Sequence, residues 1–172
     1  MKKFSFFAVF ALAALLTVAC GSKGQEATAE GGAEAAEAVQ DGNKFEGQNF
    51  SLVYPKEWKE TFASEGTLNA SSEDGVSLDA TYNDMGPAVA ELNVYANNWK
   101  GMKEASGAKV EDPNIDGKVL TIKSVAEGKT EMHFVVMKED KIGVAGSLKF
   151  PEGKEADFEP VLQSIIKSVA FK

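Results

Sequence analysis

Arginine is absent from this sequence of 172 residues, so all 18 basic side chains are lysines. The 26 acidic side chains outnumber them and give a formal net charge of -8 at pH 7. Nucleic-acid binding requires positive side chains that neutralise phosphates, and it commonly uses the bidentate contacts of arginine. The composition therefore argues against a nucleic-acid partner.

Cysteine and histidine occur once each, at Cys20 and His133. One cysteine excludes an internal disulfide and a cysteine-rich zinc site, and one histidine excludes any metal site with two imidazoles. The hydrophobic fraction, 44%, is that of an ordinary globular protein. We expect one modest domain preceded by a distinct N-terminal segment, and we assign no cofactor.

The N-terminus has the layout of a signal peptide. Lys2 and Lys3 precede an uncharged, apolar run over residues 4–19. A transmembrane helix needs about 20 apolar residues, so the run is short for a membrane span. Charge, apolar stretch and a small residue at the end are the three parts of a cleavable signal. Residues 1–19 are therefore predicted to be removed.

The segment Leu16-Thr17-Val18-Ala19-Cys20-Gly21 resembles the lipobox of bacterial lipoproteins. The family usually has leucine three residues before the cysteine, where this chain has Thr17. The resemblance implies cleavage between Ala19 and Cys20, a diacylglycerol on the Cys20 thiol, and a lipid-anchored place in the cell envelope. Gly21 would permit sorting to the outer membrane of a Gram-negative cell. The alternative is an ordinary secretory signal or an uncleaved anchor.

Residues 20–43 are predicted to form an acidic tether. Residues 21–43 consist largely of Ala, Glu and Gly, contain no aromatic residue, and carry five acids and one lysine. Such a segment cannot bury enough apolar surface to compensate for the entropy of ordering. As a flexible chain its reach is roughly 25 Å, enough to hold a domain clear of the lipid headgroups. The domain is expected over residues 44–172.

Alternating apolar and polar residues predict strands along the domain. The predicted strands cover residues 49–54, 59–63, 66–71, 76–82, 118–126, 129–138 and 141–150. The strand at 129–138 is apolar on both faces, so we expect it to be central and covered on both sides. A short edge strand is expected at 169–171.

Two helices are expected. The first begins at Gly86-Pro87 and ends at Gly107; its apolar stripe consists of Val89, Leu92, Ala96, Trp99 and Met102. The second is capped by Asp157 and has Pro160 in its first turn; its buried stripe consists of Phe158, Val161, Leu162, Ile165, Ile166 and Val169. Strands, helix, three strands and helix predict an α+β fold with an antiparallel sheet between helical layers.

Two segments resemble the ends of PsbP-like domains. Phe50-Ser51-Leu52-Val53-Tyr54-Pro55-Lys56-Glu57-Trp58 is similar to their opening, and residues 162–171 are similar to their terminal segment. The resemblance implies an α/β/α sandwich with a central antiparallel sheet. The family includes the extrinsic subunit of photosystem II and a nuclear factor that binds a small GTPase, and its members act mostly by binding proteins. It implies no catalytic residue; Tyr54, Pro55 and Trp58 are interpreted as packing residues.

His133 is the first candidate for catalysis. A hydrolytic triad would need it in a cleft, within hydrogen-bond reach of a serine and an acid. Because no serine lies in a G-x-S-x-G motif, we interpret His133 as a packed or hydrogen-bonded histidine.

Acidic residues offer a second set of candidates. Asp112–Gly117 matches the first half of a calcium loop, but Lys123 occupies the position of the bidentate glutamate, so we interpret it as a hairpin turn. Three acidic pairs are interpreted as solvated turn charges: Glu73-Asp74, Glu111-Asp112 and Glu139-Asp140. No metal ligand and no catalytic residue is assigned.

The sequence thus predicts a non-enzymatic lipoprotein whose domain binds a protein partner and whose lipid holds it to a membrane. The alternative is a module that binds a small ligand or a metal ion, and a hydrolase with an unrecognised site is the third possibility. A protein-binding role predicts a contiguous apolar or single-sign patch on the surface, whereas a ligand-binding role predicts a concave apolar pocket with a few converging polar groups.

Overall fold

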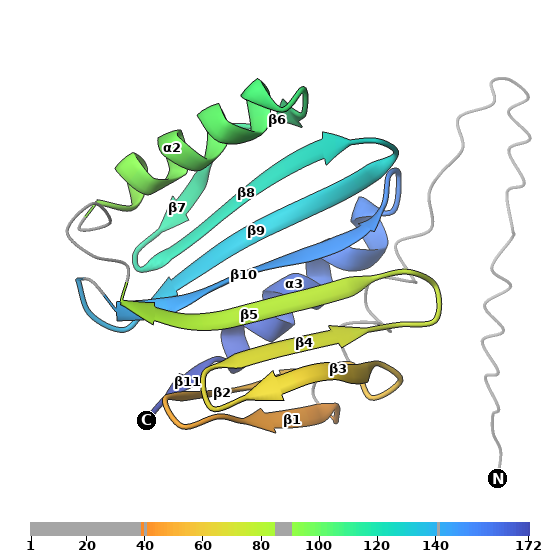
Figure 1. The fold of residues 1–172 in the computed structure, drawn as a ribbon, viewed down its shortest axis with the longest axis vertical. Coiled ribbons are helices and arrows are strands. Elements are labelled where there is room, and N and C mark those ends of the chain that lie inside the picture. The colour runs from red at the N-terminus through yellow and green to blue at the C-terminus, as the bar shows by residue number, and fades with distance from the viewer. Residues whose placement is uncertain (1–38, 40, 85–90, 141) are drawn as a thin grey trace, which may run out of the picture.

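Two antiparallel sheets of unequal size organise the domain in the computed structural model, which describes residues 39, 41–84, 91–140 and 142–172 (Figure 1). The predicted signal peptide, the Cys20 anchor and nearly all of the tether lie outside the described residues. None of the described helices is long and apolar enough to span a membrane.

The large sheet has eight described strands. They are β3 (Lys59–Ser64), β4 (Thr67–Ser71), β5 (Ser77–Asp84), β6 (Lys109–Val110), β7 (Asn114–Asp116), β8 (Val119–Ala126), β9 (Lys129–Met137) and β10 (Ile142–Pro151). Their order is β3-β4-β5-β10-β9-β8-β6, with β7 also paired to β8. The pairing of β5 with β10 joins two meanders that are distant in the sequence. The strands predicted from alternation are confirmed to within two residues at each end.

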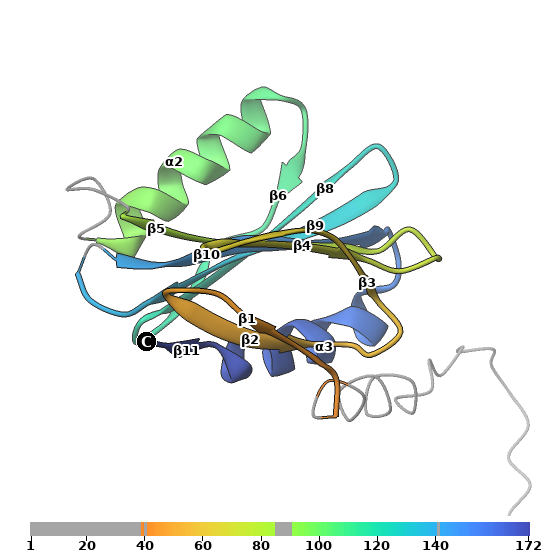
Figure 2. The ribbon, with the colours of Figure 1, turned by 60° about the horizontal axis from the view of Figure 1, so that its bottom comes forward.

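The small sheet consists of β1 (Asn43–Glu46), β2 (Phe50–Tyr54) and β11 (Ala170–Phe171), with β2 in the centre. It lies beside α3 (Glu155–Ser168), and together they cover one face of the large sheet (Figure 2). The main core fills the space between these layers. Its largest fully buried side chains include Phe50, Leu52, Leu78, Phe134, Phe150 and Leu162. Tyr54, Pro55 and Trp58 are buried there, in the packing role predicted for them.

The other face of the large sheet carries α2 (Leu92–Ala105), which packs through a second, smaller cluster. The buried members of this cluster are Ala96, Leu120, Val135 and Met137. Phe134 and Val135 are successive residues of β9, and neither is exposed, so β9 is central and covered on both faces as predicted. The predicted sandwich is therefore confirmed, with one outer layer made of a helix and a small sheet.

Gly146 shows how tightly the sheet packs on its core face. A Cβ atom there would lie 2.8 Å from the ring of Phe134 on the neighbouring strand, closer than real side-chain atoms approach. The absent side chain lets the Phe134 ring lie across β10.

Several predictions about the helices are wrong. Met102 was placed in the buried stripe of α2, yet its side chain is 61% exposed. At 100° per residue it points about 120° away from Ala96, and Lys103 takes the position toward the sheet. Asp157 was predicted as the cap of α3, but the helix begins at Glu155, so Asp157 lies within its first turn and pairs with Lys154. The predicted start of α2 at Gly86-Pro87 is also wrong, because α2 begins at Leu92, after Glu91 in extended backbone; residues 86–90 themselves lie outside the described residues. In α3, Pro160 lies in the second turn rather than the first, and Val169 follows the last helical residue.

Candidate functional site

His133 lies on β9, beneath α2, in a row of hydrogen-bonded side chains. Its Nε2 atom is 2.8 Å from the hydroxyl of Tyr95, and its Nδ1 atom is 3.4 Å from Oγ of Ser147. The rings of Trp99 and Tyr95 stack on the imidazole, with centroids 5.0 and 5.6 Å away. Residues from α2, β9 and β10 thus converge on one imidazole.

Glu131 extends this row toward the surface. Ser147 donates a 3.0 Å hydrogen bond to Glu131, and Lys103 from α2 forms an ion pair with the same carboxylate. Lys149 lies 3.9 Å from Oε1 of Glu131, the oxygen that accepts the hydrogen bond from Ser147. Burial by itself would raise the pKa of Glu131, but hydrogen bonding and attraction from the lysines outweigh it and lower the pKa. Glu131 is therefore a carboxylate at neutral pH.

The row does not have the order of a hydrolytic triad. A triad places histidine between the nucleophile and the acid, whereas here Ser147 lies between His133 and Glu131. The second imidazole nitrogen is taken by Tyr95. Ser147 is 5% and His133 7% exposed, and burial lowers the pKa of His133 to about 4. A neutral ring with its proton on Nδ1 lets the hydrogen bonds run in one direction, from Tyr95 through His133 and Ser147 to Glu131.

The acidic candidates are dispersed over exposed turns. Each of the six residues in the three acidic pairs is exposed. Asn114–Asp116 forms β7, which pairs with β8 across a turn at Gly117, as expected for a hairpin. Asp112 accepts a 2.7 Å hydrogen bond from Lys100, and Lys123 pairs with Glu111 at 2.8 Å. Within the described parts of the chain, no group of three or more potential ligands is placed to hold a metal ion.

One half of the large sheet has an open face, formed by β3, β4 and β5 on the side of α2. Because Leu68 and Leu78 point into the core, alternation directs their neighbours to the opposite side. These neighbours are Thr67, Asn69, Ser71, Ser77, Asp79 and Thr81, paired across the two strands. Phe62 of β3 stands among them, 53% exposed. No described element lies over this half, while α2 lies toward β8 (Figures 1 and 2).

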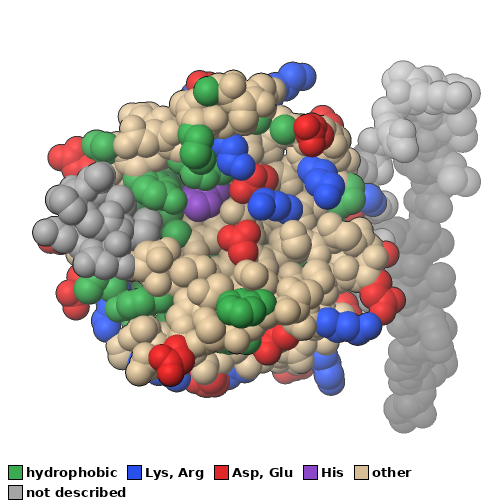
Figure 3. Space-filling model, viewed as in Figure 1, with side chains coloured by type: hydrophobic (Ala, Val, Ile, Leu, Met, Phe, Trp, Pro, Cys, Tyr) green, Lys and Arg blue, Asp and Glu red, His purple; other side chains and the backbone are tan. Residues whose placement is uncertain are grey.

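Figure 3 looks onto this open face: the surface is mostly polar, with separate hydrophobic patches and a group of charged side chains near the histidine. Asp79 on β5 lies near the charged side chains of Lys149, Glu131 and Lys103, and burial raises the pKa of its carboxyl group.

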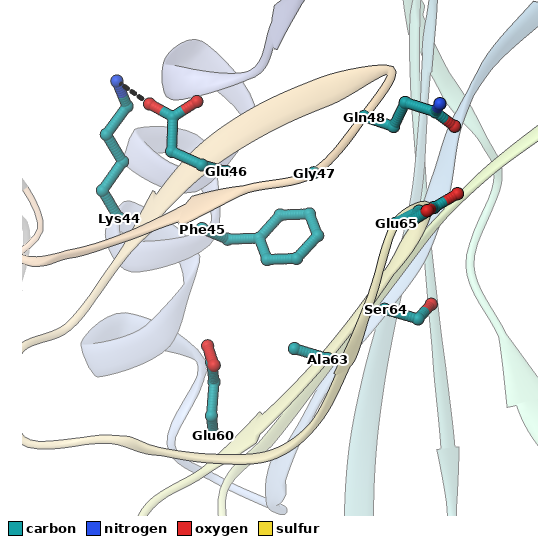
Figure 4. Close-up of a pocket in the computed structure, with 9 residues that line it drawn as sticks. All are labelled: Lys44, Phe45, Glu46, Gly47, Gln48, Glu60, Ala63, Ser64 and Glu65. Carbon is teal, nitrogen blue, oxygen red and sulfur yellow. Dashed lines mark ion pairs between the residues drawn. The ribbon is translucent and has the colours of Figure 1, made fainter.

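A hollow that we name the edge groove separates β1 from β3. Its volume is about 600 Å³. It is lined by Lys44, Phe45, Glu46, Gly47, Gln48, Glu60, Ala63, Ser64 and Glu65. Figure 4 shows the Phe45 ring directed into the space toward Ala63, with charged side chains around it.

A second hollow, the α2 pocket, has a volume of about 300 Å³. Leu92, Ile115 and Met137 give it apolar walls. Its remaining lining residues are Glu91, Asn93, Gly117, Lys118, Glu139 and Asp140.

The sequence pointed to neither hollow. Each forms where separate segments of the chain come together, and each mixes a few apolar residues with charged residues of the kind that cover any protein surface. The nearest sequence signal was Glu139-Asp140, which was interpreted as a turn and lies at the rim of the α2 pocket.

Comparisons with known proteins identify the fold. No protein-family model matches the sequence, and no curated protein matches it significantly. Among solved structures, PsbP (CyanoP) from Synechocystis sp. PCC 6803 is similar with a TM-score of 0.55 and 12% identity, over 88% of this chain and 98% of that chain. The Saccharomyces cerevisiae Ran-binding protein Mog1p is similar with a TM-score of 0.52 and 12% identity, over 70% of this chain and 89% of that chain.

A mutant form of Mog1 is similar as well, with a TM-score of 0.53 and 13% identity, over 74% of this chain and 95% of that chain. The chain therefore has the α+β fold shared by Mog1 and PsbP-like proteins. At these identities the similarity concerns the fold alone.

Proposed function

We propose that the chain is a lipid-anchored lipoprotein of the cell envelope whose domain binds a protein partner and catalyses no reaction. The observation that carries this proposal is the open face of β3, β4 and β5, where Phe62 is exposed among polar side chains. Non-obligate protein interfaces are about as polar as the rest of the surface and are enriched in aromatic residues, so the exposed Phe62 supports an interface on this face. A protein of this fold, Mog1p, is described as Ran-binding, which supports a binding role.

The anchor part of the proposal rests on the sequence. Lipid on Cys20 after cleavage at Ala19 would hold the chain on a membrane, and residues 21–38 would space the domain from it. The flexible tether would then keep the domain within roughly 25 Å of the lipid surface.

The non-enzymatic part is supported by the row of side chains at His133. Its serine is nine-tenths buried and bonded to the acid rather than activated by the histidine. This arrangement joins α2 to the sheet, and it leaves no exposed nucleophile next to a free base.

The second candidate function is small-ligand binding in the α2 pocket. Apolar walls with a few polar groups at the rim are the usual lining of a ligand site. A pocket of about 300 Å³ would accept only a small molecule.

Photo-crosslinking in the producing cells tests the proposal. A photoreactive amino acid is placed at Asn69 or Thr81 on the open face, and at Glu152 in an exposed turn as the control. We expect the same partner protein to be captured from both face positions and not from the control. Equal capture from Glu152, or capture of nothing from the face, would contradict the protein-binding role. In the latter case, a rise in melting temperature with a metabolite would favour the α2 pocket.

A further inference from the structure

The edge groove lies between two strand edges that have no partner among the described strands. β1 pairs with β2 alone, and β3 pairs with β4 alone. Each strand therefore has backbone N–H and C=O groups on one side that are free to accept another strand. The two free edges face the same hollow.

Both ends of the groove are bridged by hydrogen bonds. At one end the Asn43 amide donates to the carbonyls of Lys56 and Trp58, both at 3.1 Å. At the other end the backbone N–H of Gln48 donates to the carbonyl of Glu65 at 2.6 Å. Because the start of β1 lies at the start of β3 and their ends also meet, the two strands run in the same direction. Between the bridges the opening is as long as β1, about 13 Å for four residues.

The groove offers an apolar surface and unneutralised negative charge. Phe45 and Ala63 provide the apolar part. Glu46 is paired with Lys44 and Lys172, which lower its pKa. In the described part of the chain no lysine pairs with the carboxylate of Glu60 or Glu65. Glu60 instead accepts a 3.4 Å hydrogen bond from Tyr54. These two carboxylates favour a cationic occupant.

We propose that the edge groove binds an extended, basic segment of the partner protein, which adds a strand between β1 and β3. This inference rests on the proposed protein-binding function and adds the place and chemistry of one contact. Backbone hydrogen bonds to a free edge provide affinity, and alternate side chains provide specificity. The side chains on the groove side would lie with their aliphatic parts on Phe45 and Ala63 and place their cations near Glu60 and Glu65, which line the same hollow.

The same features disfavour two other occupants. A second copy of β3 would bring Glu60 and Glu65 against like charges, and the acidic tether would do the same. In addition, the pairing of β3 with β4 shifts register between Glu60 and Phe62. Such an irregularity bends an edge strand and limits the regular pairing it can offer. The free edge therefore suits a short segment rather than an open-ended stack of copies.

The test uses the full-length lipidated protein in detergent micelles. The probe is a fluorescent peptide of four residues, the length of β1 and of the opening between the bridges, with alternating valine and lysine. A valine–glutamate peptide and a valine–lysine peptide with a central proline are the controls. We expect the lysine peptide alone to bind, and to slow amide hydrogen exchange in Asn43–Glu46 and Lys59–Ser64.

Charge-reversed variants identify the carboxylates. The double variant Glu60→Lys with Glu65→Lys should weaken peptide binding roughly tenfold or more. The single variant Glu65→Lys should weaken binding by a smaller factor. The matched control, Asp74→Lys with Glu152→Lys, makes the same charge change on two exposed turns and should leave binding unchanged. Circular dichroism confirms that each variant is folded.

Three outcomes would overturn the inference. They are binding without protection of β1 and β3, equal weakening by the control variant, and protection of β3 that rises with protein concentration when no peptide is present. The last would mark self-association. If the partner is captured from Asn69 and Thr81 while the peptide fails to bind, the protein-binding function stands and the groove is not its contact.

Discussion

His133 illustrates at the scale of a single residue how burial sets a protonation state. The neighbouring groups that face it are Tyr95 and Lys103 from α2, Glu131 from its own strand, and Lys149 from β10. Burial dominates and lowers its pKa to about 4, although the attraction of Glu131 opposes the shift. The neutral ring can therefore accept from Tyr95 while it donates to Ser147.

Stability should fall as the pH is lowered because of this residue. Its pKa is about 4 in the folded chain and about 6.5 when unfolded, so between pH 6.5 and pH 4 mainly the unfolded chain gains the proton. The free energy of unfolding should decrease by about 2 kcal/mol from pH 8 to pH 5. In the His133→Gln variant, the free energy of unfolding measured with urea should change less between pH 8 and pH 5. An unchanged pH profile in the variant would show that His133 does not cause the loss.

At the scale of elements, α2 depends on a narrow contact with the sheet. Trp99 is 8% exposed and stacks on His133, whereas Met102 is 61% exposed on the outer side. Trp99→Ala should lower the free energy of unfolding by about 3 kcal/mol, and Met102→Ala should change it by less than about 0.5 kcal/mol. Denaturant unfolding of the two variants measures the difference. Equal losses would mean that α2 packs in another orientation.

The sequence was informative about elements because local patterns determine them. Alternation of Phe50, Leu52 and Tyr54 marked one strand correctly, and two apolar faces marked β9 as central. The prediction failed at Met102 because the residue was assigned to the buried stripe for being apolar. On the helix it lies about 120° away from the buried Ala96. It failed at Asp157 because α3 begins at Glu155, with Lys154 rather than Asp157 in the cap position.

The hollows could not be predicted in this way. The edge groove forms because β1 and β3 are both edge strands. Their edge positions depend on how all the strands pair and cannot be read from the residues of β1 and β3. His133 was recognised as a packed or bonded residue, but its partners Tyr95 and Ser147 lie 38 and 14 residues away. Only the topology brings them together.

At the scale of the whole molecule, the proposed anchor would localise the chain and the proposed binding domain would contact the partner. Cys20→Ser should abolish incorporation of labelled fatty acid and release the protein from the membrane fraction, since the thiol is the expected acceptor. The domain of the released variant should still bind the partner captured from the open face. Persistent labelling of the variant would show that Cys20 is not the attachment site.

The pairing within the small sheet determines when this part of the fold is completed. Its central strand, β2, pairs with β1 on one edge and with β11, more than 110 residues later, on the other. Because a chain is synthesised from its N-terminus, β1 and β2 emerge early, and the second edge of β2 stays unpaired until Ala170–Phe171 emerges. That edge is the last part of the small sheet to be paired. We therefore expect chains interrupted before α3 to aggregate through this edge, and we expect chaperones to bind it longest.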